Sequence, residues 1–316
     1  MKFLNKLTKT QKIIFAVIVA VFLAFSFIKT YFPSLLGLST WNSNINLVAS
    51  GKLNDAENKS LSVHFIDVGQ GDCTLIKTDN GNMLIDTGNS IDGDNICKYL
   101  LSHNVRSVDY LVITHPHSDH YGGAVRILDL IEVKNVLMPE IDEKYYKDDE
   151  DYIFLLNKIS KMKIPVFAAR AGDIYKLGEA VFTVLSPISE NENVNEMSAV
   201  IRLDYKDTSF IFMGDAESIT EKNLLDSKFN LECDVLKIGH HGSPNASGKE
   251  FLKAVHPFVS VISCGYDNEY GHPGENVLYS LKKLDSAILR TDLNGDIVIG
   301  SDGEKLYCWF EKGKRY

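Results

Sequence analysis

The sequence predicts an α/β protein in which one β-sheet packs against another and helices cover the outer faces. Each half of the folded region holds several short apolar runs of strand length, followed by helix-like segments. An Asn80-Gly81 pair joins two of these runs and is a strong hairpin signal. In addition, His and Asp side chains repeatedly follow the ends of apolar runs, where α/β sheets usually build their sites.

The first 33 residues form a separate segment by composition. Lysines precede an uncharged apolar run over residues 13–28, which is slightly shorter than the roughly 20 residues of a membrane-spanning helix. Lys29 can snorkel, so the span extends to Phe32. We expect residues 1–33 to be a single-pass anchor in the cell membrane, with the body outside the cell. A signal peptide cleaved near Ala24, giving a secreted form, and a core helix are the alternatives.

Residues 34–60 are rich in polar residues without periodicity and are expected to form a flexible tether. The folded domain is placed at residues 61–316. The first 33 residues carry five lysines and no acid, so the rest holds 28 basic and 42 acidic side chains, a net charge of −14. Such a body repels a polyanion at long range, so nucleic-acid binding would need a local basic patch or metal ions. The five cysteines are scattered and form no CxxC pair, so the sequence suggests neither a zinc knuckle nor a disulfide framework.

The expected elements follow from alternating or continuously apolar runs for strands and from longer amphipathic segments for helices. In the first half, we expect strands at 62–68, 73–77 and 82–86, a helix at 94–103, a strand at 110–114, a helix at 123–131, a strand at 135–138, a helix at 151–161, and strands at 166–169, 174–177 and 180–185. In the second half, we expect strands at 198–205 and 209–213, a helix at 217–226, a strand at 234–238, a helix at 248–255, a strand at 258–263, a helix at 275–284 and three closing strands ending at Trp309.

The stretch Thr114–Gly123, between an expected strand and an expected helix, contains three histidines and an aspartate within six positions. Imidazole and carboxylate together suit zinc, manganese or iron. His115 and His117 lie two apart in an extended loop and can share one ion. Asp119 and His120 are adjacent at the turn into the helix and can serve a second ion. The simpler interpretation is a polar loop that happens to be rich in histidine.

Four further places collect metal-type ligands after apolar runs. Singly, each has a simpler explanation, because an Asp after a strand often starts a turn and a lone His is usually structural. The repetition favours a shared site, since the ends of parallel strands converge on one edge. The four places are Asp86, Asp215, the pair His240-His241 followed by Ser243, and His272.

The motif His115-x-His117-x-Asp119-His120, with Asp86 upstream and Gly214-Asp215 downstream, resembles the metallo-β-lactamase superfamily over residues 61–311. The resemblance implies a four-layer αββα sandwich that holds metals between its sheets. It implies that Asp215 bridges two ions and that Asp86 is a second-shell carboxylate that fixes a ligand. The last ligand would be His240 or His241, of which we favour His240.

A narrower resemblance links the chain to the extracellular hydrolase domain of ComEC-type DNA-uptake proteins, which is regarded as a nuclease. It rests on five segments, which are residues 64–72, 84–88, 237–243, 270–273 and 290–292. It implies two divalent ions, Zn²⁺ or Mn²⁺, that hold a hydroxide for attack on a phosphodiester, with DNA as the first substrate to test. In this interpretation Asp119 orients the nucleophile, and His241, His272 and Ser243 contact substrate. We expect no nucleotide cofactor.

One departure from the superfamily pattern concerns a middle histidine. Residues 121–214 contain no His, and the nearest polar candidates are Asn195 and Ser198. The first ion would therefore have fewer protein ligands, which favours manganese over a second zinc there. Alternative functions are hydrolysis of another ester, such as phosphorylcholine on wall polymers or a lactone, and a non-catalytic DNA-uptake accessory module. Activity on β-lactams is disfavoured, because the resemblance runs to another branch.

Overall fold

The computed structural model describes residues 47–49 and 52–311, and the structural statements below concern this part of the chain. The predicted membrane anchor, residues 1–33, lies outside it. Among the described helices, none combines the length and the apolar character that crossing a bilayer requires.

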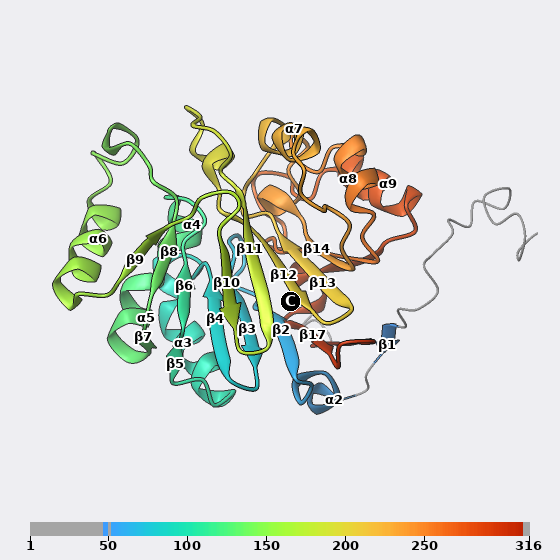
Figure 1. Ribbon diagram of the computed structural model, residues 1–316, viewed down its shortest axis with the longest axis horizontal. Coiled ribbons are helices and arrows are strands. Elements are labelled where there is room, and N and C mark those ends of the chain that lie inside the picture. The colour runs from blue at the N-terminus through green and yellow to red at the C-terminus, as the bar shows by residue number, and fades with distance from the viewer. Residues whose placement is uncertain (1–46, 50–51, 312–316) are drawn as a thin grey trace, which may run out of the picture. The chain divides into compact units, whose positions relative to one another are not determined.

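Two large β-sheets form the centre of the described domain (Figure 1). The first has nine strands in the order β1-β18-β17-β2-β3-β4-β6-β8-β9, and the second has seven in the order β10 to β16. A small sheet pairs β5 (Ser107–Val108) with β7 (Glu132–Val133). The strands of the first sheet are β1 (Leu47–Ala49), β2 (Leu61–Phe65), β3 (Thr74–Thr78), β4 (Gly81–Ile85), β6 (Tyr110–Val112), β8 (Val136–Met138), β9 (Val166–Ala168), β17 (Ile297–Ser301) and β18 (Leu306–Phe310). Those of the second are β10 (Ile174–Leu177), β11 (Ala180–Ser186), β12 (Val200–Tyr205), β13 (Thr208–Phe212), β14 (Val235–Lys237), β15 (Val259–Ile262) and β16 (Ala287–Arg290).

Helices connect the strands and cover both outer faces. They are α2 (Leu53–Glu57), α3 (Gly93–Ser102), α4 (Ser118–Tyr121), α5 (Ala124–Leu130), α6 (Glu150–Met162), α7 (Ser218–Asp226), α8 (Lys249–Val255), α9 (Glu275–Lys283) and α10 (Thr291–Asn294). Short 3-10 turns lie at Ser90–Asp92, Glu143–Tyr145, Val194–Met197 and Gly239–Gly242. The expected helices and strands are present, and their bounds mostly differ by one or two residues from those predicted.

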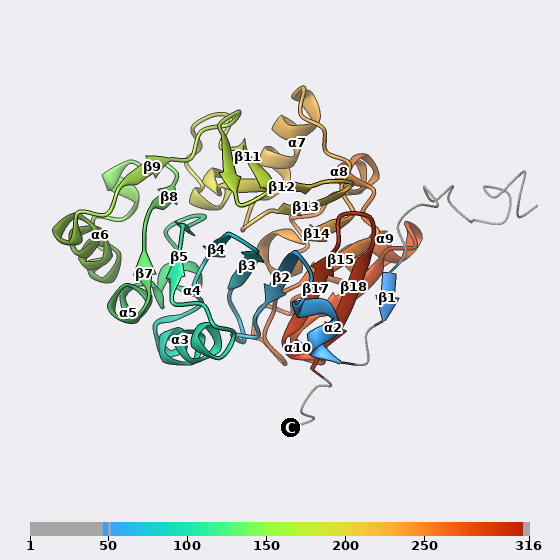
Figure 2. The ribbon, with the colours of Figure 1, turned by 60° about the horizontal axis from the view of Figure 1, so that its bottom comes forward.

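Three apolar cores define four layers. The central core lies between the two sheets, where Phe65 and Phe212 face each other with ring centroids 6.2 Å apart. A second core packs the outer face of the first sheet against α3, α5 and α6, and a third packs the outer face of the second sheet against α7, α8 and α9. Figure 2 shows these two groups of helices on different sides of the sheets. The predicted αββα sandwich is confirmed, because each sheet buries one face on the other sheet and one on helices.

Sheet topology brings the ligand-bearing segments together. In the first sheet, β4, β6 and β8 run parallel, and in the second, β13, β14 and β15 run parallel. Asp86 follows β4, His115 follows β6, Asp215 follows β13 and His240 follows β14. The carboxyl ends of parallel strands meet at one edge of each sheet, so residues distant in sequence gather where the two edges adjoin.

The range 34–60 predicted as a tether is too long at its C-terminal end. Strand β1 pairs with β18, and Ala56 of helix α2 is buried against β17. The contact depends on Gly300, since a Cβ at that position would collide with the carbonyl oxygen of Ala56. Composition alone missed this short helix because it carries a single buried side chain and therefore shows no amphipathic period.

Candidate metal centre

Asp86 organises the loop that carries the histidines. Both the backbone N–H and the hydroxyl of Thr114 donate to its carboxylate, at 2.8 and 2.7 Å. Its Oδ2 also lies 2.8 Å from Nδ1 of His120, so the ring presents Nε2 to the interior of the centre. Asp86 has a φ of 58°, a left-handed conformation that is uncommon outside glycine and concentrated at functional sites. A carboxylate behind a histidine ring is the usual arrangement around metal-ligating histidines.

Asp215 lies at the middle of the centre, and its two carboxylate oxygens face two different groups of imidazoles. Oδ1 is 3.2 Å from Nε2 of His120 and 3.7 Å from Nε2 of His241. Oδ2 is 3.7 Å from Nε2 of His115 and 3.6 Å from Nε2 of His240. The two oxygens of this carboxylate thus adjoin two different pairs of imidazoles.

Each group has additional donors. On the Oδ1 side, Oδ2 of Asp119 lies 3.2 Å from Nε2 of His241 and 3.9 Å from Nε2 of His120. On the other side, Nε2 of His115 lies 2.9 Å from Nδ1 of His117. Ligand atoms of His115, His120 and Asp215 lie within 4.8 Å of one another, and those of Asp119, His120 and His241 do as well.

Burial and the neighbouring charged groups together shift the pKa values of the donor residues. Burial, together with the nearby His120, holds the pKa of His115 well below its usual value, so this ring is a neutral donor. Burial alone would lower the pKa of His120, but the carboxylates of Asp215 and Asp86 outweigh it and raise that pKa well above the usual value. Despite burial, the hydrogen bond from His241 and the neighbouring His120 lower the pKa of Asp119 to about 2.

Unpartnered polar atoms test whether these residues fit a cation. His120 Nε2 and Asp215 Oδ1 are buried and have no hydrogen-bond partner, although buried polar groups are nearly always satisfied. The two atoms lie 3.2 Å apart. Divalent ions that take imidazole and carboxylate ligands would satisfy both atoms, so the donor set fits a metal.

Comparison with protein families agrees with this geometry. The model of the metallo-beta-lactamase superfamily matches residues 66–266, which contain every donor described above. The chain belongs to the metallo-β-lactamase superfamily. It is therefore classed as a metal-dependent hydrolase related to competence proteins.

Two curated relatives match most of the length of this chain. ComE operon protein 3 of Bacillus subtilis is 30% identical over 254 residues, which cover 74% of this chain and 32% of that protein. Competence protein ComA of Neisseria gonorrhoeae is 31% identical over 239 residues, covering 74% of this chain and 31% of that protein. The chain thus spans about a third of the length of these relatives. The solved structure of CmlA, a diiron β-hydroxylase from Streptomyces venezuelae, superposes with a TM-score of 0.54 at 15% identity, covering 77% of this chain and 54% of that one, and shows the fold alone.

Within the metallo-β-lactamase domain, the two adjacent histidines face different oxygens of Asp215. We favoured His240 over His241 as the last ligand. It is Nε2 of His241 that contacts Asp119, and ligand atoms of Asp119, His120 and His241 lie within 4.8 Å of one another. His240 instead faces the other oxygen of Asp215. Both residues have positive φ, 46° and 53°, so the chain turns sharply between them and separates their rings.

The other predicted residues lie at the edge of the centre. Ser198 accepts a hydrogen bond from the backbone N–H of Asp215 at 3.1 Å and so holds the backbone of Asp215. The ring of His272 lies 5.5 Å from that of His240 and 6.4 Å from that of His241, measured between centroids. Ser243 is buried in the turn after His241, where its hydroxyl accepts from the N–H of Asn245, and no contact of its side chain with the donors is found among the described residues.

Three further residues support the donors, and of these neither Lys237 nor Glu217 had a predicted role. Lys237, with 2% of its side chain exposed, lies 2.8 Å from Oδ2 of Asp72, whose Oδ1 is 3.3 Å from Nδ1 of His241. The third, Glu217, binds Nδ1 of His240 at 2.8 Å. A signal for the first pair was present, since a lysine inside the apolar strand 234–238 requires a buried acidic partner. Local sequence contains no such signal for Glu217.

Proposed function

We propose that the chain is a binuclear, metal-dependent phosphodiesterase that cleaves DNA outside the cell, anchored in the membrane by residues 1–33. The observation that carries the proposal is the position of Asp215, whose two oxygens face two separate groups of donors. The relation to competence proteins supports DNA as the substrate. The metal ions would be Zn²⁺ or Mn²⁺, which match the imidazole and carboxylate ligands.

The residues of the centre have distinct tasks in this reaction. Two bound ions would supply Lewis acidity and a water of lowered pKa. Asp119 is the most accessible carboxylate of the centre, with 28% of its side chain exposed, and its low pKa keeps it a hydrogen-bond acceptor at neutral pH. It can therefore orient an attacking water. His272, whose pKa is lowered by burial and by His240, is a neutral ring at the edge that can contact the phosphodiester.

The purified 316-residue chain should convert supercoiled plasmid to nicked and linear forms with added Mn²⁺ or Zn²⁺. Excess chelator should abolish cleavage, and readdition of metal should restore it, because no side chain of the centre replaces the Lewis acid. Asp119→Ala should lose most of the activity while keeping its fold, as judged by circular dichroism. Absence of cleavage with every metal would refute the nuclease, and equal cleavage by Asp119→Ala would indicate a contaminating enzyme.

A second candidate, hydrolysis of a small diester such as phosphorylcholine on wall polymers, is favoured by a groove of about 670 Å³ near the centre. The groove includes Met197, which directly precedes Ser198 in the chain. Four carboxylates line it with one lysine and one tyrosine, a surface that repels the DNA backbone and suits a cationic group. The lining residues are Glu140, Ile141, Asp142, Lys144, Tyr145, Glu190, Asn191, Glu192 and Met197.

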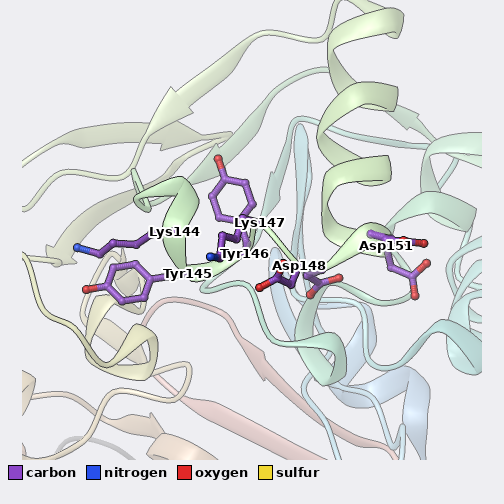
Figure 3. A pocket seen from close by; sticks show the side chains of 8 residues that line it. Lys144, Tyr145, Tyr146, Lys147, Asp148 and Asp151 are labelled. Atoms are coloured by element: carbon purple, nitrogen blue, oxygen red, sulfur yellow. The ribbon is translucent and has the colours of Figure 1, made fainter.

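A neighbouring hollow of about 560 Å³ is lined by residues 144–151 and includes none of the donor residues of the metal centre (Figure 3). Lys144 and Tyr145 lie at one end of it and Asp151 at the other. The hydroxyl of Tyr121 donates a hydrogen bond to the carboxylate of Asp149, at 2.7 Å from Oδ1 and 2.8 Å from Oδ2. This contact connects the segment to the residue that follows His120. The segment is thus a support beside the centre, and the groove is the better candidate for substrate contact.

Competing chromogenic substrates separate the two candidates. If the groove selects the substrate, p-nitrophenylphosphorylcholine should be hydrolysed faster than bis-p-nitrophenyl phosphate, and Glu190→Gln with Glu192→Gln should reduce this preference. If DNA is the substrate, the same double variant should cleave plasmid at least as fast as wild type, since it removes two negative charges. A preference for the choline ester that survives the double variant would contradict the role of the groove.

A further inference from the structure

The donor group around Oδ2 of Asp215 is one ligand short by the superfamily pattern. His115 and His117 supply two imidazoles, and Asp215 supplies a carboxylate. No histidine occurs between residues 121 and 214. Ser198, the nearest polar candidate, has its hydroxyl oxygen engaged by the backbone N–H of Asp215. Structural and catalytic zinc sites nearly always have at least three protein ligands and commonly four-coordinate geometry.

His240 faces the same carboxylate oxygen of Asp215 as His115 does. Its Nε2 is 3.6 Å from Oδ2 of Asp215, and Nε2 of His115 is 3.7 Å from the same oxygen. Two donors at roughly 2.0–2.2 Å from one tetrahedral ion are about 3.3–3.6 Å apart. Both imidazoles therefore stand at the separation from Asp215 that sharing an ion with it requires.

The back of the His240 ring is held as in a metal ligand. Oε1 of Glu217 lies 2.8 Å from Nδ1 of His240, and the backbone N–H of Glu217 donates to Oε2 of Glu196 at 3.2 Å. A ligand histidine almost always donates its second N–H to a carboxylate or carbonyl, which fixes the tautomer and leaves Nε2 free for the ion. His240 also has a φ of 46°, and strained non-glycine backbone is concentrated at functional sites.

We propose that His240 replaces the missing middle histidine as the third imidazole ligand of the first ion. The first ion is then held by His115, His117, His240 and Oδ2 of Asp215. The second is held by Asp119, His120, His241 and Oδ1 of Asp215. The proposal rests on the binuclear site proposed above. In it, the adjacent residues His240 and His241 bind different ions.

Metal titration of the chelator-treated 316-residue chain tests this proposal without an activity readout. Titration calorimetry with Zn²⁺ should give a stoichiometry of two bound ions per wild-type chain. His240→Ala should keep one ion at wild-type affinity and bind the other at least about tenfold more weakly. Glu217→Gln should weaken the same ion to a smaller extent. Visible absorption of the Co²⁺ form should lose intensity in His240→Ala, since four-coordinate cobalt absorbs far more strongly than higher coordination.

Two controls identify which ion is affected. His272→Ala removes a neighbouring histidine that has no contact with Asp215 among the described residues, and should keep both ions. His241→Ala should weaken binding of the other ion, so that the double variant with His240→Ala binds neither ion tightly.

If the wild type binds two ions and His240→Ala binds both equally well, the role of His240 is refuted while the binuclear hydrolase stands. If the wild type loads both ions but cleaves no phosphodiester, the proposed function fails and the ligand assignment is retained. Should His240→Ala fail to fold, unchanged affinity in Glu217→Gln overturns the proposal by itself.

Discussion

Asp215→Ala should lower the rate of phosphodiester hydrolysis by on the order of 10³-fold or more and reduce the bound metal below one ion per chain. Asp215 is the single residue whose oxygens face both donor groups. Its loss removes one ligand from each ion, and loss of a supporting partner alone typically costs 10–100-fold in metal affinity or activity. Steady-state hydrolysis of a chromogenic diester, with metal content measured by mass spectrometry, checks both effects.

Asp207→Ala is the matched control for this variant. Asp207 is exposed in the turn between β12 and β13, just before the strand that leads to Asp215, and its variant should keep full activity and metal content. Asp215→Asn keeps the shape of the side chain but loses its charge, so it should resemble the alanine variant more than the wild type. Retention of two ions by Asp215→Asn, with activity within about tenfold of wild type, would contradict a bridging role.

Lys237→Met should lower the free energy of unfolding by about 3–5 kcal/mol, because it leaves the carboxylate of Asp72 buried without its cation. Lysine and methionine have similar length, so the substitution tests charge more than packing. Urea unfolding of the chelator-treated protein at pH 7 measures the loss without a contribution from bound metal. Lys253→Met, which breaks an exposed pair with Glu250, should leave stability unchanged.

The pH dependence of this loss follows from the pKa of Asp72. Burial alone would raise that pKa, but Lys237 and the hydrogen bond with His241 outweigh it and lower the pKa below its usual value. A carboxyl with a lowered folded-state pKa stabilises the protein above its unfolded pKa of about 3.9, and the stabilisation disappears as the pH falls through the folded value. The gap between wild type and Lys237→Met should therefore be largest near neutral pH and shrink in acid. A gap that is independent of pH would mean that lost packing, and not the unpaired charge, causes the effect.

Much of this molecule could be predicted from local sequence. Alternation along residues 62–65, the Asn80-Gly81 turn and the apolar runs before each ligand depend on side-chain periods of two or 3.6 residues, which are visible without a structure. The short loop from His115 to His120 could be predicted equally well, because its four donors are neighbours in the chain. Helix α2 was missed, since one buried alanine gives no period.

Other features depend on where the fold brings distant segments. In the sequence His240 and His241 are adjacent, and nothing local to them decides which ring faces which donors. Their positive φ angles turn one ring toward Oδ2 of Asp215 and the other toward Asp119 and Oδ1. The pairing of Lys237 with Asp72 and of Glu217 with His240 likewise joins residues from separate strands and loops. Local sequence therefore determined the chemical type of the centre and its strand-end positions. Tertiary structure decided which donor faces which oxygen, because that depends on ring orientations set by backbone turns and by partners far away in the chain.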